Sequence, residues 1–267
     1  MTEPLLLVQG LRKVFSGRRS SPGLVAVDDV GFDLRPGDSL AIVGESGSGK
    51  TTTARIIAGL ETASEGRVLL SGTPIAGPGV RRPGSPDIQM VFQDPSGSLD
   101  PRQRIGGAIA EFLTLRRYPR AQRRARVHEL LEAVGLDERH AAEYPRNLSG
   151  GQRQRVTIAR ALALQPRILI LDEAVSALDV SVQAQVLNVL IDIRRRLGVS
   201  YLFVSHDLAV VRQISDRCLV MRAGRVVEHG TTSEVLDHPR ELYTRQLLEA
   251  IPRPGWKPRR RPSLTTL

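Results

Sequence analysis

The stretch of this 267-residue chain that decides its fold is Gly44-Glu45-Ser46-Gly47-Ser48-Gly49-Lys50-Thr51. It has the spacing G-x-x-x-x-G-K-[ST], whose glycines let the backbone wrap until successive N–H groups face phosphate oxygens. A run of apolar residues at 40–43 precedes it, and a helical pattern begins near Lys50. The order of strand, glycine-rich loop and positive helix end therefore predicts a phosphate-binding loop, or P-loop.

The side chains of this loop predict a nucleotide site. Lys50 is expected to reach the β- and γ-phosphates, and the Thr51 hydroxyl is expected to ligate Mg²⁺. Thr52 is expected to add a phosphate contact. Chance produces such a pattern in roughly one chain of this size in a hundred, and the strand and helix around it lower those odds. The P-loop alone does not distinguish kinases, GTPases and transport ATPases.

Other patterns predict an α/β core around the loop. Apolar runs at 168–171 and 202–204 are typical of strands buried on both faces of a parallel sheet. Helical patterns over 127–134 and 182–197 lie between such runs. Short apolar alternations between residues 5 and 34 predict β-strands on the N-terminal side of the loop.

The same patterns divide the chain into regions. Residues 1–251 are expected to form one domain, with an Arg-rich helical lobe inserted in the α/β core over about 94–154. The Pro- and Arg-rich tail, 252–267, is predicted to be disordered.

Charge and composition narrow the function classes. The formal net charge of +10, from 38 basic and 28 acidic residues, suits nucleotides, nucleic acids or an acidic membrane surface and does not choose among them. The one cysteine, Cys218, excludes an internal disulfide and a four-cysteine metal site within the chain. No apolar run approaches the roughly 18–20 residues that cross a bilayer, and the start does not have the pattern of a signal peptide. We therefore expect a cytoplasmic protein, and any membrane role would have to depend on a partner.

Two acidic residues follow the second apolar run. Strand ends are where ligands bind in open α/β sheets, so Asp172 is expected to hold Mg²⁺ and Glu173 to act as general base toward a water molecule. The alternative is a strand that ends in a solvated acidic turn. A P-loop in the same chain makes that alternative the weaker one.

A second glycine motif, Leu148-Ser149-Gly150-Gly151-Gln152, precedes a helical pattern over 153–164. Ser149 and the glycine N–H groups at a helix start form another anion site. A chance match to five fixed residues is roughly a one-in-a-thousand event or rarer. The motif resembles the signature sequence of ABC ATPases. That resemblance implies a head-to-tail dimer in which Ser149, Gly150, Gly151 and Gln152 of one subunit cover the ATP of the other.

The resemblance extends over about residues 5–252 and assigns further roles. Gln93, after an expected strand at 88–92, resembles the Q-loop glutamine, which senses Mg²⁺ or water. Asp179 is similar to the D-loop aspartate, and His206 to the switch histidine near the γ-phosphate. Phe15 occupies the place of the aromatic residue that stacks on adenine. Each has a plain structural alternative, such as a polar loop residue or a core aromatic, which the shared order of the motifs disfavours.

Three stretches resemble the ATPases of oligopeptide, dipeptide and nickel importers: 91–102, 175–187 and 242–252. The match has departures, because Asp100 replaces Asn, Ala174 replaces Pro, and Glu241-Leu242 replaces His-Pro before Tyr243. The cysteine cluster that some relatives carry near the C-terminus is absent from the sequence. Peptide is therefore the first expected cargo, with nickel or another small solute as the alternative.

The resemblance implies the ATP-hydrolysing subunit of an importer at the cytoplasmic face of the membrane. Its expected partners are a second ABC ATPase subunit, identical or paralogous, transmembrane permease subunits and, indirectly, an extracytoplasmic solute-binding protein. Two rival classes remain open: an ABC protein acting on nucleic acid or ribosomes, and a module that holds ATP without turnover. One cassette without heptads disfavours the first, so no nucleic acid is expected, and intact Lys50, Asp172, Glu173 and His206 disfavour the second.

Overall fold

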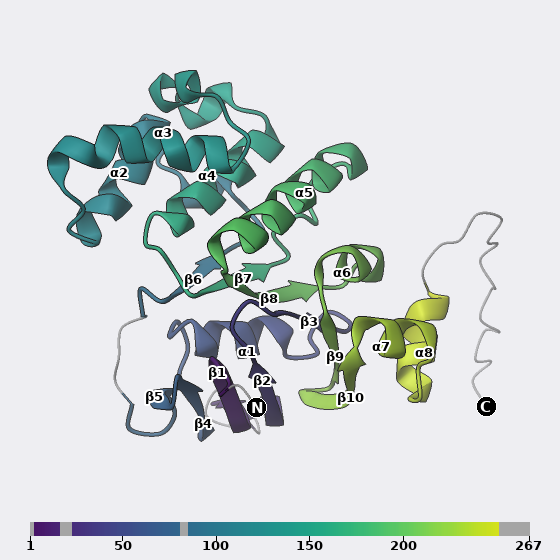
Figure 1. Ribbon diagram of the computed structural model, residues 1–267. Helices are drawn as coiled ribbons and strands as arrows, with labels where there is room; N and C mark the ends of the chain where they lie inside the picture. Colours follow the sequence, from purple (N-terminus) through teal and green to yellow (C-terminus); the bar gives the residue numbers. More distant parts are fainter. Residues whose placement is uncertain (1–2, 17–22, 81–84, 251–267) are drawn as a thin grey trace.

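The computed structural model describes residues 3–16, 23–80 and 85–250, which form two β-sheets and a layer of helices (Figure 1). The smaller sheet is antiparallel and has the strand order β2-β1-β4-β5. Buried and exposed residues alternate along much of β1, as expected for a strand with one solvated face. The strands are β1 (Leu6–Phe15), β2 (Leu24–Leu34), β4 (Glu65–Leu70) and β5 (Thr73–Ala76).

The larger sheet has the order β10-β9-β3-β8-β7-β6, and only β10 pairs antiparallel. All residues of β3, β7 and β8 are buried, which confirms the strands predicted from consecutive apolar residues. The strands are β3 (Ser39–Val43), β6 (Ile88–Val91), β7 (Ile168–Asp172), β8 (Ser200–Ser205), β9 (Arg217–Arg222) and β10 (Arg225–Thr231).

The two faces of the larger sheet pack into separate cores. On one face Ile42 and Ile170 join the smaller sheet and helix α1 (Lys50–Ile57). On the other face Leu171 and Phe203 join the other helices. These are α2 (Ile105–Leu115), α3 (Arg123–Ala133), α4 (Gly150–Leu162), α5 (Val180–Leu197), α6 (Leu208–Ile214), α7 (Thr232–Asp237) and α8 (Leu242–Glu249).

The helical lobe expected over about 94–154 contains α2, α3 and four short 3₁₀ turns, and α4 continues without a break through Leu162. The predicted helix over 153–164 instead begins at Gly150, because Ser149 caps it with its side chain. The tail 252–267 lies outside the described residues. Among residues 3–16, 23–80 and 85–250, no helix combines the length and apolar character that a bilayer span requires.

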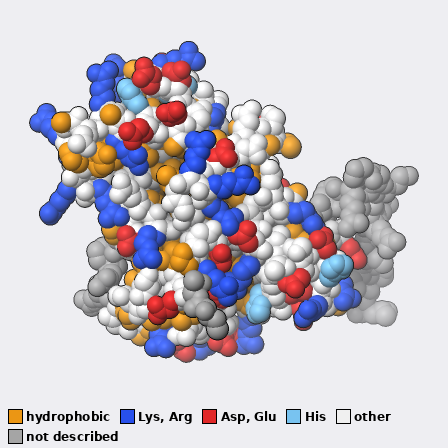
Figure 2. All heavy atoms as spheres, in the orientation of Figure 1, with side chains coloured by type: hydrophobic (Ala, Val, Ile, Leu, Met, Phe, Trp, Pro, Cys, Tyr) orange, Lys and Arg blue, Asp and Glu red, His pale blue; other side chains and the backbone are white. Residues whose placement is uncertain are grey.

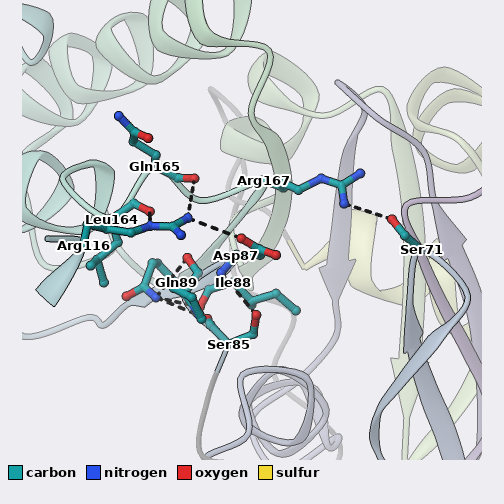
Figure 3. A network of polar contacts seen from close by, with 10 residues as sticks. Ser71, Ser85, Asp87, Ile88, Gln89, Arg116, Leu164, Gln165 and Arg167 are labelled. Carbon is teal, nitrogen blue, oxygen red and sulfur yellow. Dashed lines mark hydrogen bonds and ion pairs between the residues drawn. The ribbon is translucent and has the colours of Figure 1, made fainter. Parts of the chain in front are cut away.

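Arg116, at the end of α2, ties the helical layer to the sheet (Figure 3). Its Nε donates to the carbonyl oxygen of Leu164 at 2.6 Å, and its guanidinium lies 3.3 Å from Asp87 Oδ1, just before β6. Arg167, just before β7, donates through its backbone N–H to the carbonyl of Asp87 and through its side chain to Ser71, in the turn between β4 and β5. The end of α2 and the segment between α4 and β7 are thus both joined to the residue that precedes β6.

A bidentate ion pair joins the two sheets. Arg217 of β9 donates to both carboxylate oxygens of Asp33 in β2, at 3.0 and 3.1 Å. These hydrogen bonds hold the pKa of Asp33 below its usual value of 3.8. Because the folded protein favours the charged carboxylate, the pair stabilises the fold above that value and ceases to do so as the pH falls below it.

We expect Asp33→Asn to lower the free energy of unfolding by about 1 kcal/mol at pH 7, as a half-exposed bidentate pair does. Urea denaturation of the parent and the variant should give a difference in unfolding free energy that is constant from pH 7 to 5 and becomes smaller below about pH 4. Asp29→Asn, at an exposed position of the same strand, should change stability by less than about 0.5 kcal/mol. If the difference in unfolding free energy between the parent and Asp33→Asn did not change with pH down to the acid unfolding of the protein, the carboxylate charge would not be the cause of the stabilisation.

Candidate active site

Four parallel strands end at the same edge of the larger sheet. Val43 pairs with Ser205, Val204 with Asp172 and Leu171 with Val91, so the carboxyl ends of β3, β8, β7 and β6 lie side by side. Within two positions of each end lies a residue that the sequence singled out, and ligands bind at such edges. These residues are Gly44, His206, Glu173 and Gln93.

The P-loop approaches neighbouring backbone too closely for side chains. Gly44 has φ +150°, and a Cβ there would lie 2.2 Å from the carbonyl oxygen of Met221. Gly49 has φ +100°, and its Cβ would lie 2.4 Å from the carbonyl oxygen of Ala26. Glycine is therefore required at both positions by conformation and by space. Between them Glu45, Ser46 and Gly47 are exposed and Ser48 is buried.

Lys50 is buried inside its own loop. Its Nζ donates to the carbonyl oxygens of Gly44 and Glu45 at 2.8 and 2.7 Å. Burial lowers the pKa of Lys50, and the nearby charges of Glu173, Asp172 and Glu45 oppose that shift. The ammonium group is thus already located in the cradle that the glycines form.

Thr51 and Asp172 meet across the edge of the sheet. The Thr51 hydroxyl donates to Asp172 Oδ1 at 3.0 Å, and the half-buried Thr52 follows it in α1. Burial raises the pKa of Asp172, although the Thr51 hydrogen bond lowers it in part. A hydroxyl and a buried carboxylate so close together are the hard oxygen donors that Mg²⁺ prefers, so the residues present fit that ion.

Glu173 turns sharply out of β7 toward His206. Its backbone has φ +49°, a left-handed conformation that is unusual for glutamate, and its N–H donates to the carbonyl oxygen of Val204. Its Oε1 lies 3.3 Å from His206 Nδ1. The structure therefore brings together Lys50, Thr51, Asp172, Glu173 and His206.

Two further expected site residues make no polar contact with this group among the described residues. Gln93 is exposed two positions after β6. Phe15 ends β1, is 37% exposed and has the Lys13 ammonium 4.9 Å from its ring centroid. It pairs with Leu24, two positions before Ala26, whose carbonyl packs against Gly49.

The motif at 148–152 begins helix α4. The Gln152 N–H donates to Ser149 Oγ at 3.2 Å, and the Ser149 N–H donates to Gln152 Oε1 at 2.8 Å, which is a capping box. Gly151 is buried against α5, where a Cβ would lie 2.1 Å from Val182 Cγ1. Gly150 has room for one, because the nearest atom is 3.6 Å away.

This motif does not meet the P-loop within the chain. Among the described residues no hydrogen bond or ion pair joins 149–152 to 44–52, and α4 and α1 lie on opposite faces of the larger sheet (Figure 1). Asp179 caps α5 by accepting from the Val182 N–H at 3.0 Å. Both segments thus have a structural role of their own in addition to any role in binding.

One contact with the P-loop was missed by the sequence analysis. The Glu45 N–H donates to the hydroxyl oxygen of Tyr243 in α8 at 3.2 Å. Tyr243 belongs to the C-terminal stretch that indicated the subfamily, but nothing in a single sequence pairs it with a residue 198 positions away.

Comparison with known proteins gives consistent results. The family model described as ABC transporter matches residues 27–176. The chain is 48% identical over 258 residues to the glutathione import ATP-binding proteins GsiA of Escherichia coli (strain K12) and of Salmonella typhimurium. These alignments cover 94% of the chain and 41% of each relative, so the chain spans about two fifths of their length.

Two solved structures are similar over most of the chain. One is cbiO1 from Clostridium perfringens, part of the ABC transporter complex cbiONQ, with TM-score 0.78 and 29% identity over 89% of this chain and 92% of that one. The other is a dimeric post-hydrolysis state of the ATP-binding cassette MJ0796 bound to ADP and Pi. It has TM-score 0.73 and 28% identity over 85% of this chain and 98% of that one.

The packing of α4 on α5 generates a testable prediction. Gly151→Ala should destabilise the fold by about 1–3 kcal/mol, because the new methyl group overlaps a β-branched side chain that has little freedom to move. Gly150→Ala is the matched control and should change stability by less than about 1 kcal/mol in either direction. Urea denaturation measures both, and equal effects of the two substitutions would contradict the close contact at Val182.

Proposed function

Because the chain belongs to the ABC transporter family, we propose that it is the ATP-hydrolysing subunit of an importer and works as one half of a two-ATPase assembly. The observation that carries this proposal is the convergence of Lys50, Thr51, Asp172, Glu173 and His206 at one edge of the sheet. A cation, a hydroxyl and two carboxylates in such an arrangement suit phosphoryl transfer, which needs positioning and charge neutralisation rather than covalent help.

ATP binds to the P-loop in this proposal. The backbone N–H groups from Ser46 to Thr52 surround the phosphates, while Gly44 and Glu45 form the start of the loop. Lys50 exchanges its loop carbonyls for phosphate oxygens, and Phe15 stacks on adenine. Thr51, Asp172 and Gln93 would hold Mg²⁺, which supplies positive charge next to the β- and γ-phosphates when it is bound.

Glu173 and His206, which follow β7 and β8, carry out hydrolysis in this proposal. Glu173 orients a water molecule and accepts its proton as the oxygen attacks the γ-phosphorus and the bond to the β-phosphate oxygen breaks, giving ADP and phosphate. His206, 3.3 Å from Glu173, donates toward the γ-phosphate and fixes the orientation of the carboxylate. The left-handed backbone conformation of Glu173 is strained, and such strained residues are often found at functional sites.

A second subunit completes the site. The start of α4 presents unpaired helix N–H groups and Ser149, and these lie on the opposite face of the sheet from the subunit's own P-loop. In a head-to-tail dimer Ser149, Gly150, Gly151 and Gln152 of one subunit cover the nucleotide of the other, with Asp179 at the same interface.

The cargo is a short peptide in this proposal. The similar Escherichia coli and Salmonella proteins are named for glutathione import, and glutathione is a tripeptide. Permease subunits hold the ATPase at the cytoplasmic face of the membrane, and an extracytoplasmic solute-binding protein delivers the peptide. On the face seen in Figure 2, acidic side chains are interspersed among the basic ones. This face therefore lacks the continuous basic stripe that is typical of a nucleic-acid-binding surface.

The experiment that tests transport is co-purification followed by reconstitution. The chain, tagged and expressed with candidate permease subunits, should copurify with a membrane complex. The ATPase rate of that complex should rise when peptide and binding protein are added to proteoliposomes. If Ni²⁺ instead of peptide stimulated the ATPase rate, the proposed cargo would be nickel. Copurification with ribosomes or nucleic acid in place of permeases would refute the transport role.

Glu173→Gln should separate binding from hydrolysis. We expect ATP affinity within about threefold of the parent and a phosphate-release rate lower by about 10²–10³-fold, because the amide cannot accept the proton of water. Glu132→Gln, at an exposed position of α3, is the matched control and should retain the parental rate. A Glu173→Gln protein that hydrolyses ATP at the parental rate would exclude Glu173 as the base.

A further inference from the structure

The last described helix, α8, contacts the P-loop through one side chain. Tyr243 is only 5% exposed, and its hydroxyl oxygen accepts a hydrogen bond of 3.2 Å from the Glu45 N–H. The helix comes after every strand and motif that the proposed reaction uses. This contact therefore has no role in the mechanism described so far.

The peptide group that Tyr243 contacts is also the one that holds Lys50. The Glu45 N–H and the Gly44 carbonyl belong to the same peptide unit, and that carbonyl accepts from Lys50 Nζ at 2.8 Å. Tyr243 thus fixes one end of the unit and Lys50 fixes the other. Without the first bond the unit could rotate, because Gly44, with φ +150° and no side chain, resists rotation less than any other residue would.

Tyr243 is itself held in place from two directions. The guanidinium of Arg222, at the end of β9, lies 4.8 Å from its ring centroid. The Glu228 carboxylate in β10 accepts from the N–H groups of Arg240 and Glu241 at 2.8 and 3.2 Å, directly before α8 begins. Burial alone would raise the pKa of Glu228, but these hydrogen bonds keep it below its ordinary value, so the carboxylate is charged and docks the start of the helix.

The β9–β10 hairpin also supports the loop directly. The carbonyl of Met221, next to Arg222, occupies the space beside Gly44, and the Gly224 N–H donates to the Ser48 carbonyl at 3.0 Å. The hairpin and α8 therefore form one connected unit with the P-loop, through Gly44, Glu45 and Ser48. A hydroxyl at this point acts on the shape of the loop and not on the chemistry at Glu173.

We propose that Tyr243 is a positioning residue for ATP binding: its hydroxyl holds the Gly44–Glu45 peptide so that the P-loop has its phosphate-binding shape before the nucleotide arrives. This inference rests on the proposed function and extends it to a helix outside the nucleotide motifs. A preorganised loop binds more tightly because less conformational freedom is lost on binding. Among the described residues no hydrogen bond or ion pair joins Tyr243 to Glu173 or His206, so its effect is expected on affinity and not on turnover.

The test is Tyr243→Phe, which removes one oxygen atom and leaves the ring beside Arg222. In the full chain we expect the Kd for Mg-ATP, measured by calorimetry, and the KM to rise about three- to tenfold, the range for one lost hydrogen bond. The kcat should stay within about twofold. Tyr201→Phe is the matched control, because it removes a buried hydroxyl that donates to the Leu190 carbonyl at 2.7 Å, away from the loop. It should lower the Tm without changing Kd or KM.

The outcomes separate this inference from the proposed function. Unchanged Kd and KM in Tyr243→Phe, an equal rise in Tyr201→Phe, or a loss confined to kcat would each overturn the positioning role. A parent protein that binds Mg-ATP but releases no phosphate would refute the ATPase function, while the Kd comparison would still decide the role of Tyr243. A parent protein that does not bind Mg-ATP would refute both.

Discussion

The site depends on the parallel pairing of β3, β8, β7 and β6, because four separate segments reach it only through the common edge of that sheet. The register is fixed by burial on both faces. Ile42, Ile170 and Val204 point into the core shared with α1, whereas Leu171 and Phe203 point into the core shared with the other helices. A slip of one residue in any strand would exchange the two faces and move the polar residue at its end out of reach.

Much of this arrangement could be predicted from the sequence, because it depends on patterns of neighbouring residues. Consecutive apolar residues at 40–43, 168–171 and 202–204 match β3, β7 and β8 within two residues at either end. The start of α4 was placed three residues late, since two glycines weaken a helical pattern that the capping box of Ser149 and Gln152 restores. The apolar runs at 218–221 in β9 and 68–70 in β4 are as long as those at 40–43 and 202–204, yet the sequence analysis gave no strand bounds there or in β5 and β10.

Contacts between distant segments could not be predicted. Asp33 and Arg217 are 184 positions apart, and Glu45 and Tyr243 are 198 apart, yet each pair joins elements that must be in register for the site to form. No periodicity or spacing encodes such partners, because they depend on how whole sheets and helices pack. The same reason applies to the proposed completion of the site by a second subunit: the motif at 149–152 can be recognised in one chain, but the P-loop that it is proposed to face belongs to another.

Backbone strain at Glu173 shows how the fold and the site constrain each other. An L-residue in the left-handed region costs of order 1–3 kcal/mol, and here the turn is held by the Glu173 N–H to the Val204 carbonyl and by the Ser176 hydroxyl to the Glu173 carbonyl. A relaxed extended backbone would continue β7 and direct the side chain toward one face of the sheet. The left-handed turn instead brings the carboxylate within 3.3 Å of His206, on the neighbouring strand end. These two hydrogen bonds offset the strain. Because their donors and acceptors lie at or just after the ends of parallel strands, the geometry of the sheet maintains the backbone conformation that the proposed base requires.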